Sequence, residues 1–143
     1  MRPLDGGIEQ FLEAYSATPY VHELGIAYRG HGPDWAEMAL PYCERLIAFP
    51  DEGFIASGAI FALADTTAGL AVFSALPQLE PIATLDLRLD YLRPATPGLD
   101  IVARVSCEKL TRRVGFVRGA CHDGDPERPV AHITGTFMRT TAP

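Results

Sequence analysis

One carboxylate stands inside the most apolar run of the chain. The run is GFIASGAIFALADTTAGLAVFSAL, residues 53–76, and Asp65 lies near its middle, followed by Thr66 and Thr67. Burying an ionised carboxylate without partners is strongly unfavourable, so Asp65 requires hydrogen bonds, water or a cleft. It is either a structural polar group bonded to Thr66 and nearby backbone, or a reactive acid in a site, and composition alone favours neither.

Small residues ahead of the acid indicate where a helix begins. Ala56, Ser57 and Gly58 suit a helix start, and Ser57 is a candidate cap. The first backbone N–H groups of a helix lack partners within it, so they attract anions and developing oxyanions. Taken alone, the segment is typical of an ordinary capped helix.

The spacing of these two features decides how they could cooperate. Asp65 is eight residues beyond Ser57, which places it roughly 12 Å along the helix from the first amides. One helix cannot bring both to the same carbonyl group. Two antiparallel helices related by a two-fold axis could set the amides of one chain opposite the acid of the other, so a shared site predicts a dimer.

Periodicity predicts the elements that position this helix. Apolar residues recur at helical spacing over 8–15, and alternating patterns predict strands over 35–40, 83–93 and 100–110. In the second of these strands, Leu85, Leu87, Leu89 and Tyr91 are expected to form one buried face. Polar turns then lead into strands over 114–122 and 130–138, so the last three strands form an antiparallel meander. The order predicts an α+β fold in which an antiparallel sheet wraps the long helix.

Size and charge bound the class of protein. The chain has 143 residues and a formal net charge of -6, which predicts one domain over 1–143 and gives nucleic acid or an anionic membrane little to bind. The start of the chain does not resemble a secretory signal, and the apolar arms on either side of Asp65 are each about half the length that spans a bilayer. We expect a cytoplasmic protein that does not enter membranes.

Cysteine and histidine usage gives no metal pattern. Cys43, Cys107 and Cys121 are odd in number and widely spaced, as expected for reduced, packed thiols. The four histidines have no second ligand at the spacing of a zinc site. We expect neither a metal nor a cofactor.

Three segments resemble the hotdog-fold thioesterases, in particular the PaaI-like (phenylacetic-acid-degradation) acyl-CoA thioesterases. They are residues 53–76, the stretch ATLDLRLDYLRPATPGLDIVARV, and VAHITGTFM near the end. The resemblance implies a hotdog fold, dimers that often pair into tetramers, and hydrolysis of acyl-CoA thioesters without a cofactor. It assigns Asp65 as the catalytic carboxylate, and Ser57 as the position whose amide polarises the thioester carbonyl. We expect the amide of Gly58 to help hold the oxyanion.

Two side chains typical of that family are absent. Ala56 and Pro50 stand where its members usually carry His and Asn. An amide oxyanion hole is made of backbone and survives this change. Asp65 would act either as general base on water or as a nucleophile that forms a mixed anhydride, and the sequence does not separate these routes.

Coenzyme A carries phosphates, so basic residues are expected near the site. Lys109, Arg112 and Arg113 cluster at a predicted hairpin tip and could pair with phosphate. The acyl group would meet apolar residues such as Phe54, Phe61 and Leu63.

Two other functions and one other catalytic route are open. The absent His and Asn are compatible with a non-catalytic module that binds acyl-CoA. A hotdog dehydratase and a Ser57 hydroxyl nucleophile are less well supported, because no histidine lies between Gly32 and Phe116 and no G-x-S-x-G elbow surrounds Ser57.

Overall fold

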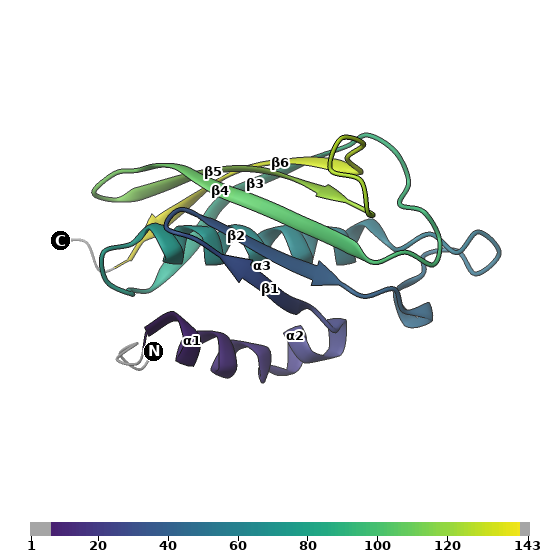
Figure 1. Ribbon diagram of the computed structural model, residues 1–143, viewed down its shortest axis with the longest axis horizontal. Coiled ribbons are helices and arrows are strands. Elements are labelled where there is room, and N and C mark those ends of the chain that lie inside the picture. The colour runs from purple at the N-terminus through teal and green to yellow at the C-terminus, as the bar shows by residue number, and fades with distance from the viewer. Residues whose placement is uncertain (1–6, 141–143) are drawn as a thin grey trace.

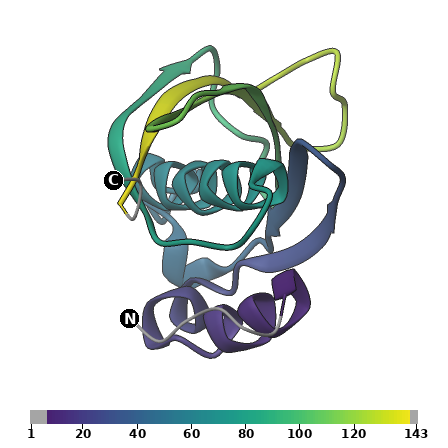
Figure 2. The ribbon, with the colours of Figure 1, turned by 90° about the vertical axis from the view of Figure 1, so that its left-hand side faces the viewer.

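The computed structural model of the protein describes residues 7–140. A strongly curved six-stranded sheet curls around one long helix, and two short helices lie on the side that the sheet leaves open (Figures 1 and 2). The elements are α1 (Gly7–Ser16), α2 (Pro19–Leu24), β1 (Ala27–His31), β2 (Trp35–Leu40), the 3-10 helix η1 (Glu44–Leu46), α3 (Ser57–Ala75), β3 (Ile82–Tyr91), β4 (Ile101–Leu110), β5 (Val114–His122) and β6 (Ala131–Arg139).

The strand order is β1-β2-β4-β5-β6-β3, and every neighbouring pair is antiparallel. The predicted meander of the last three strands is confirmed, as is the α+β architecture of a sheet wrapped around a long helix. Alternation along β4 buries Ile101, Ala103, Val105 and Cys107 as expected. Strands β1 and β3 are the free edges of the sheet.

Helix α3 is apolar on nearly all sides because the sheet encloses it. Among the described residues it is the one helix long and apolar enough to cross a membrane. Its burial explains this composition: eleven of its 19 residues are buried, including Leu63, Ala64 and Ala68, which have no exposed surface. A helix that is hydrophobic all round belongs in a core as readily as in a bilayer.

One narrow line along α3 escapes the sheet. Ser57 and Phe61 are exposed, whereas Asp65, Gly69 and Phe73 are partly buried. These five residues, spaced by four, lie one above another on a single helix face, and we call them the open stripe. Asp65 therefore avoids the cost of full burial because it occupies the middle of the one uncovered face.

The edge strand β3 differs from the expected alternation. Its register against β6 shifts between Thr84 and Asp86, which marks Leu85 as a bulged residue. The bulge changes the phase of the strand, so Thr84 faces α3 and Leu85 is 55% exposed. The prediction that Leu85 and Tyr91 share one buried face is wrong, since Tyr91 is also exposed within this chain.

Sequence patterns missed the elements around the first helix. Pro19, expected only to follow that helix, is the first residue of α2, a position that proline favours. Gly25 then ends α2 with φ of 75°, a left-handed conformation that glycine adopts without strain. The predicted cap was also wrong: Ala56 is the N-cap of α3, with no side-chain hydrogen bond, and Ser57 is the first helical residue.

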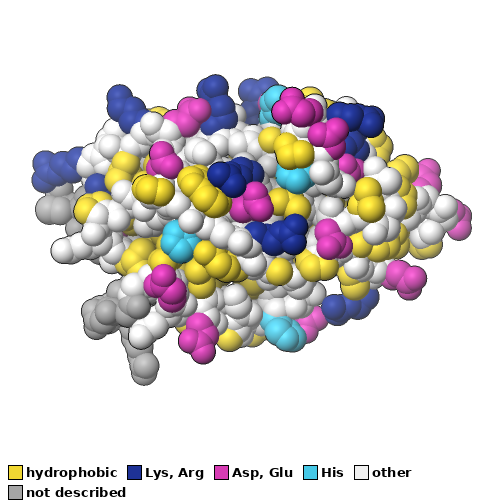
Figure 3. All heavy atoms as spheres, viewed as in Figure 1, with side chains coloured by type: hydrophobic (Ala, Val, Ile, Leu, Met, Phe, Trp, Pro, Cys, Tyr) yellow, Lys and Arg dark blue, Asp and Glu magenta, His cyan; other side chains and the backbone are white. Residues whose placement is uncertain are grey.

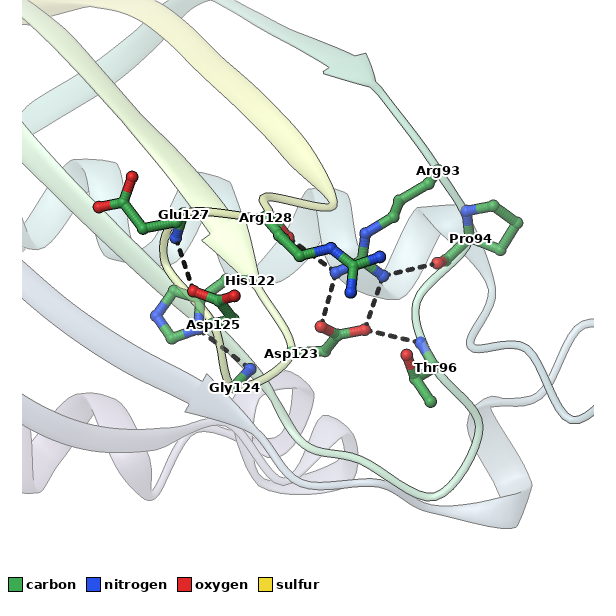
Figure 4. A network of polar contacts seen from close by, with 9 residues as sticks. All are labelled: Arg93, Pro94, Thr96, His122, Asp123, Gly124, Asp125, Glu127 and Arg128. Atoms are coloured by element: carbon green, nitrogen blue, oxygen red, sulfur yellow. Dashed lines mark hydrogen bonds and ion pairs between the residues drawn. The ribbon is translucent and has the colours of Figure 1, made fainter.

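A partly buried ion pair fixes the loop that follows β3 (Figure 4). The Arg93 guanidinium donates to both carboxylate oxygens of Asp123, at 2.9 and 2.7 Å, and to the Arg128 carbonyl. The Thr96 amide also donates to Asp123. The guanidinium of Arg93 is the main reason that the pKa of the Asp123 carboxyl lies well below its usual range. The pair holds the β3–β4 connection against the β5–β6 loop.

Candidate active site

Asp65 is held by a residue from the sheet edge. The Thr84 hydroxyl of β3 donates a hydrogen bond of 2.8 Å to Oδ1 of Asp65. The carboxylate therefore does not rely on Thr66 for a partner, and Thr67 bonds instead to the Leu63 carbonyl. Among the described residues only Oδ1 of the acid accepts a hydrogen bond, so Oδ2 can meet water or a substrate.

The start of α3 presents open backbone donors. Gly58 has no neighbour within 4 Å of the position that a side chain would take, and Ser57 and Gly58 are both exposed. Within the described residues, neither amide donates a backbone hydrogen bond. The Tyr91 hydroxyl accompanies this end of the helix and donates to the Ser57 carbonyl at 2.9 Å. An anion or an oxyanion could dock at these amides.

The acid and the amides are separate within one chain. α3 is a continuous helix from Ser57 to Ala75, so Asp65 remains about 12 Å from the helix start along its axis. Asp65 and Ser57 nevertheless both lie on the open stripe. The geometry agrees with the expectation that one chain does not assemble both groups around one carbonyl.

An apolar pocket of about 430 Å³ adjoins Asp65 on the other side. It lies between α1, α3 and the sheet, and both Asp65 and Thr84 contribute to its wall. Its size is typical of small-molecule sites, which are mostly apolar with a few polar groups. The apolar lining includes Phe11, Tyr15, Gly69, Phe73, Ile82 and Phe137.

The pocket is not lined by the residues expected to contact the acyl group. Leu63 is fully buried in the core, and neither Phe54 nor Phe61 is part of the lining. No sequence signal pointed to Thr84, because the bulge at Leu85 that turns it inward was not visible in the alternating pattern. Phe11 and Tyr15 were identified only as the apolar face of a short helix.

The basic hairpin lies at the far end of α3. Gly115, just after the tip, packs against Val72 of α3. The hairpin that bears Lys109, Arg112 and Arg113 therefore lies near the C-terminal end of the helix, whereas Ser57 is at its start (Figure 1). Lys109, Arg112 and Arg113 are exposed. On the face shown in Figure 3, basic and acidic side chains are interspersed and form no single basic patch. Within residues 7–140, no cluster of His, Cys, Asp and Glu could hold a metal ion.

A sheet curled around a long helix, with an acid and open amides on the exposed face of that helix, defines a hotdog-type protein. The model of the thioesterase superfamily matches residues 52–130, and this chain belongs to that superfamily. The matched segment contains the whole of α3 and β3 to β5, whereas α1 precedes it. The predicted hotdog fold and the resemblance to PaaI-like thioesterases are confirmed.

Individual relatives agree with this assignment. A crystal structure of a protein from Pseudomonas aeruginosa is 36% identical, with a TM-score of 0.83, over 92% of this chain and 98% of that one. The phenylacetic acid degradation protein PaaI of Thermus thermophilus is 28% identical, with a TM-score of 0.74, over 85% of this chain and 99% of that one. A protein of Halobacterium salinarum named "Putative esterase" is 37% identical over 95 residues, which are 64% of this chain and 62% of the relative. The match thus spans under two thirds of that curated relative.

Proposed function

We propose that this protein hydrolyses acyl-CoA thioesters, with Asp65 as the catalytic carboxylate. The observation that carries the proposal is the position of Asp65 on the open stripe. On one side it borders the apolar pocket, and on the other side the stripe leads to the exposed helix start. An acyl-CoA thioester matches this arrangement, because it joins an apolar acyl group to a polar carrier at the reactive carbonyl.

A two-fold pairing of the open stripes over Ser57, Phe61 and Asp65 would complete the site. Phe61 lies four residues from both Ser57 and Asp65. If two α3 helices pack antiparallel with Phe61 against its counterpart, Ser57 of each chain comes opposite Asp65 of the other. Phe61 is 39% exposed, and Leu85 and Tyr91 on the neighbouring free edge are also exposed apolar residues. Burial of such a surface favours association.

In the resulting site, the Ser57 and Gly58 amides of one chain would hold the oxygen of the thioester carbonyl. Asp65 of the other chain would act in one of two ways. As a general base it would take a proton from water while the water oxygen attacks the carbonyl carbon, and the C–S bond would then break to release the CoA thiolate. As a nucleophile, Oδ2 would attack the carbonyl and expel the thiolate, giving an anhydride that water hydrolyses to the free acid and the carboxylate.

Basic residues support a CoA carrier. In an antiparallel pair centred on Phe61, the C-terminal half of one α3 extends past the partner's helix start. The hairpin that bears Lys109, Arg112 and Arg113 would then approach the partner's helix start, where the CoA moiety would leave the site. Arginine and lysine there could bind its phosphates. Arg93 is less suitable, because Asp123 and backbone carbonyls already occupy its guanidinium.

A second candidate is a module that binds acyl-CoA without hydrolysing it. Ala56 at the N-cap and Pro50 in the preceding loop supply no polar side chain to orient water. The fixed Asp65 carboxylate favours hydrolysis over this alternative, since a binding pocket gains nothing from a partly buried acid at its wall.

Release of free thiol from a series of acyl-CoAs tests the two candidates. The wild type is expected to turn over at least one substrate, and Asp65→Asn to lose at least about a hundredfold in kcat. Asp51→Asn removes an exposed carboxylate in the loop before α3 and should retain wild-type kcat. Tight binding of acyl-CoA with no thiol release by the wild type would instead favour the binding module.

A further inference from the structure

Helix α1 contributes an aromatic wall to the pocket beside Asp65. The rings of Phe11 and Phe73 lie 4.5 Å apart between their centroids, in a tilted arrangement, and bridge α1 to α3. Phe11 also stacks on Tyr15 at 5.3 Å. Both α1 residues line the pocket. Figure 2 shows α1 on the side of α3 that the sheet leaves open.

The C-terminal half of α1 is anchored, so this wall has a defined position. Leu12 is 9% exposed and belongs to the main core, as does Val21 of α2. The Thr18 hydroxyl donates to the Tyr15 carbonyl at 2.8 Å and fixes the turn between α1 and α2. The ring of Phe11 is held over the pocket by its contacts with Phe73 and Tyr15.

The pocket is deeper at Gly69 because glycine has no side chain there. Gly69 lies on the open stripe one helical turn beyond Asp65, and a methyl group at this position would come within 3.7 Å of Phe137 and 4.0 Å of Ile82. These are ordinary van der Waals distances, so alanine would fit and would take up pocket space. Residues 69 and 11 thus set the pocket dimensions from opposite sides.

We propose that Phe11 and Gly69 determine acyl specificity, and that the pocket takes a medium-chain acyl group. The proposal rests on the thioesterase function above and names its substrate class. A volume of about 430 Å³ is at the small end of ligand sites, and the contact between Phe11 and Phe73 closes the pocket between α1 and α3, which limits the length of an extended acyl chain. The wall is apolar apart from a few hydroxyl groups and Asp65, so chain length decides affinity through the apolar surface buried.

Two variants test the proposal in opposite directions. Phe11→Ala opens the α1 wall, and each further methylene buried strengthens binding about fourfold. We expect the ratio of kcat/KM for palmitoyl-CoA to that for octanoyl-CoA to rise at least about tenfold. Gly69→Ala narrows the pocket and should lower this ratio. Because alanine favours a helix over glycine, this variant should also have a raised Tm, which separates loss of pocket space from misfolding.

Tyr20→Ala is the matched control. Tyr20 is an α2 aromatic residue, 67% exposed, outside the pocket lining, and its loss should leave the ratio unchanged. An unchanged ratio in both Phe11→Ala and Gly69→Ala, with wild-type turnover intact, would overturn the proposal.

Binding of non-hydrolysable thioether analogues of octanoyl-CoA and palmitoyl-CoA separates this proposal from the hydrolytic function. If the wild type releases no thiol but binds the octanoyl analogue more tightly, and Phe11→Ala reverses that preference, the pocket assignment stands and the hydrolase assignment fails. Equal binding of both analogues by the wild type and Phe11→Ala would overturn the pocket assignment by itself.

Discussion

The Thr84 hydroxyl donates a hydrogen bond to Oδ1 of Asp65 over 2.8 Å and thereby joins the free edge strand to the central helix. This contact exists because the bulge at Leu85 turns Thr84 toward α3. A carboxylate on an open helix face would otherwise sample several rotamers. The edge strand thus orients the acid, and the side of the carboxylate that bears Oδ2 remains available.

Replacing Thr84 by valine keeps the shape of the side chain and removes this hydrogen bond. Hydrogen bonds to charged groups contribute about 1.5–3 kcal/mol, so we expect kcat to fall about tenfold or more, with little change in KM. Thr84→Ser retains the hydroxyl and should recover most of kcat. Steady-state kinetics on one acyl-CoA checks both variants, and wild-type kcat in Thr84→Val would show that the contact has no part in turnover.

Phe61 should control self-association. Phe61→Lys places like charges against one another across the proposed two-fold axis and should yield a folded monomer with at least about a hundredfold less activity. Sedimentation velocity measures the oligomeric state, and circular dichroism verifies the fold.

Phe49→Lys provides the control for that experiment. Phe49 is 64% exposed, lies in the loop before α3 and is not one of the residues of the open stripe. This variant should associate like the wild type. If Phe61→Lys also associates like the wild type, then α3 is not the contact surface.

The Arg93–Asp123 pair should make stability depend on pH. Asp123→Asn leaves a partly buried guanidinium without its counter-ion and should lower the free energy of unfolding at pH 7 by about 3 kcal/mol. The native pKa of Asp123 is lowered, so its contribution is present above the unfolded value of about 3.9 and declines as pH falls toward the native pKa. Urea unfolding should show the difference between wild type and variant narrowing below about pH 4. A difference that stays constant on acidification would contradict this assignment.

The three thiols should differ in reactivity. Burial raises the pKa of Cys121 to about 12 and also raises that of Cys107. Hydrogen bonds from Arg45 lower the pKa of Cys43, and the bond from the Arg45 backbone amide has the largest effect. Native protein treated with a thiol reagent at neutral pH should therefore be labelled at Cys43 well before the other two. Peptide mass spectrometry locates the label, and early labelling of Cys121 would contradict the burial seen in the core.

Regular patterns account for what could be predicted from the sequence. The strand over 35–40 has the predicted limits, and the burial of β4 follows its alternation. The long helix was identified by its composition, and Asp65 stood out because an acid is unfavourable in such a segment. These features depend on local periodicity and on the free energy of burying charge, which a single sequence displays directly.

The remaining features depend on contacts between distant segments. The bulge in β3 is set by pairing with β6, so alternation alone placed Leu85 on the wrong face and left Thr84 unnoticed. The pocket requires α1 to lie across α3, which no pattern in the first twenty residues predicts. The prediction that Ser57 caps α3 is wrong because the N-cap is Ala56, which makes no side-chain hydrogen bond, and Ser57 is already helical.

A mixture of two inactive variants tests the shared site most directly. Asp65→Asn removes the acid, whereas Ser57→Pro removes one amide at the first helical position, where proline fits. If each site combines Asp65 of one chain with the amides of the other, a mixed dimer regains one complete site, and equal mixing after reversible dissociation should restore about a quarter of wild-type activity. No recovery above the separate variants, with mixed dimers verified by mass spectrometry, would contradict a site built from two chains.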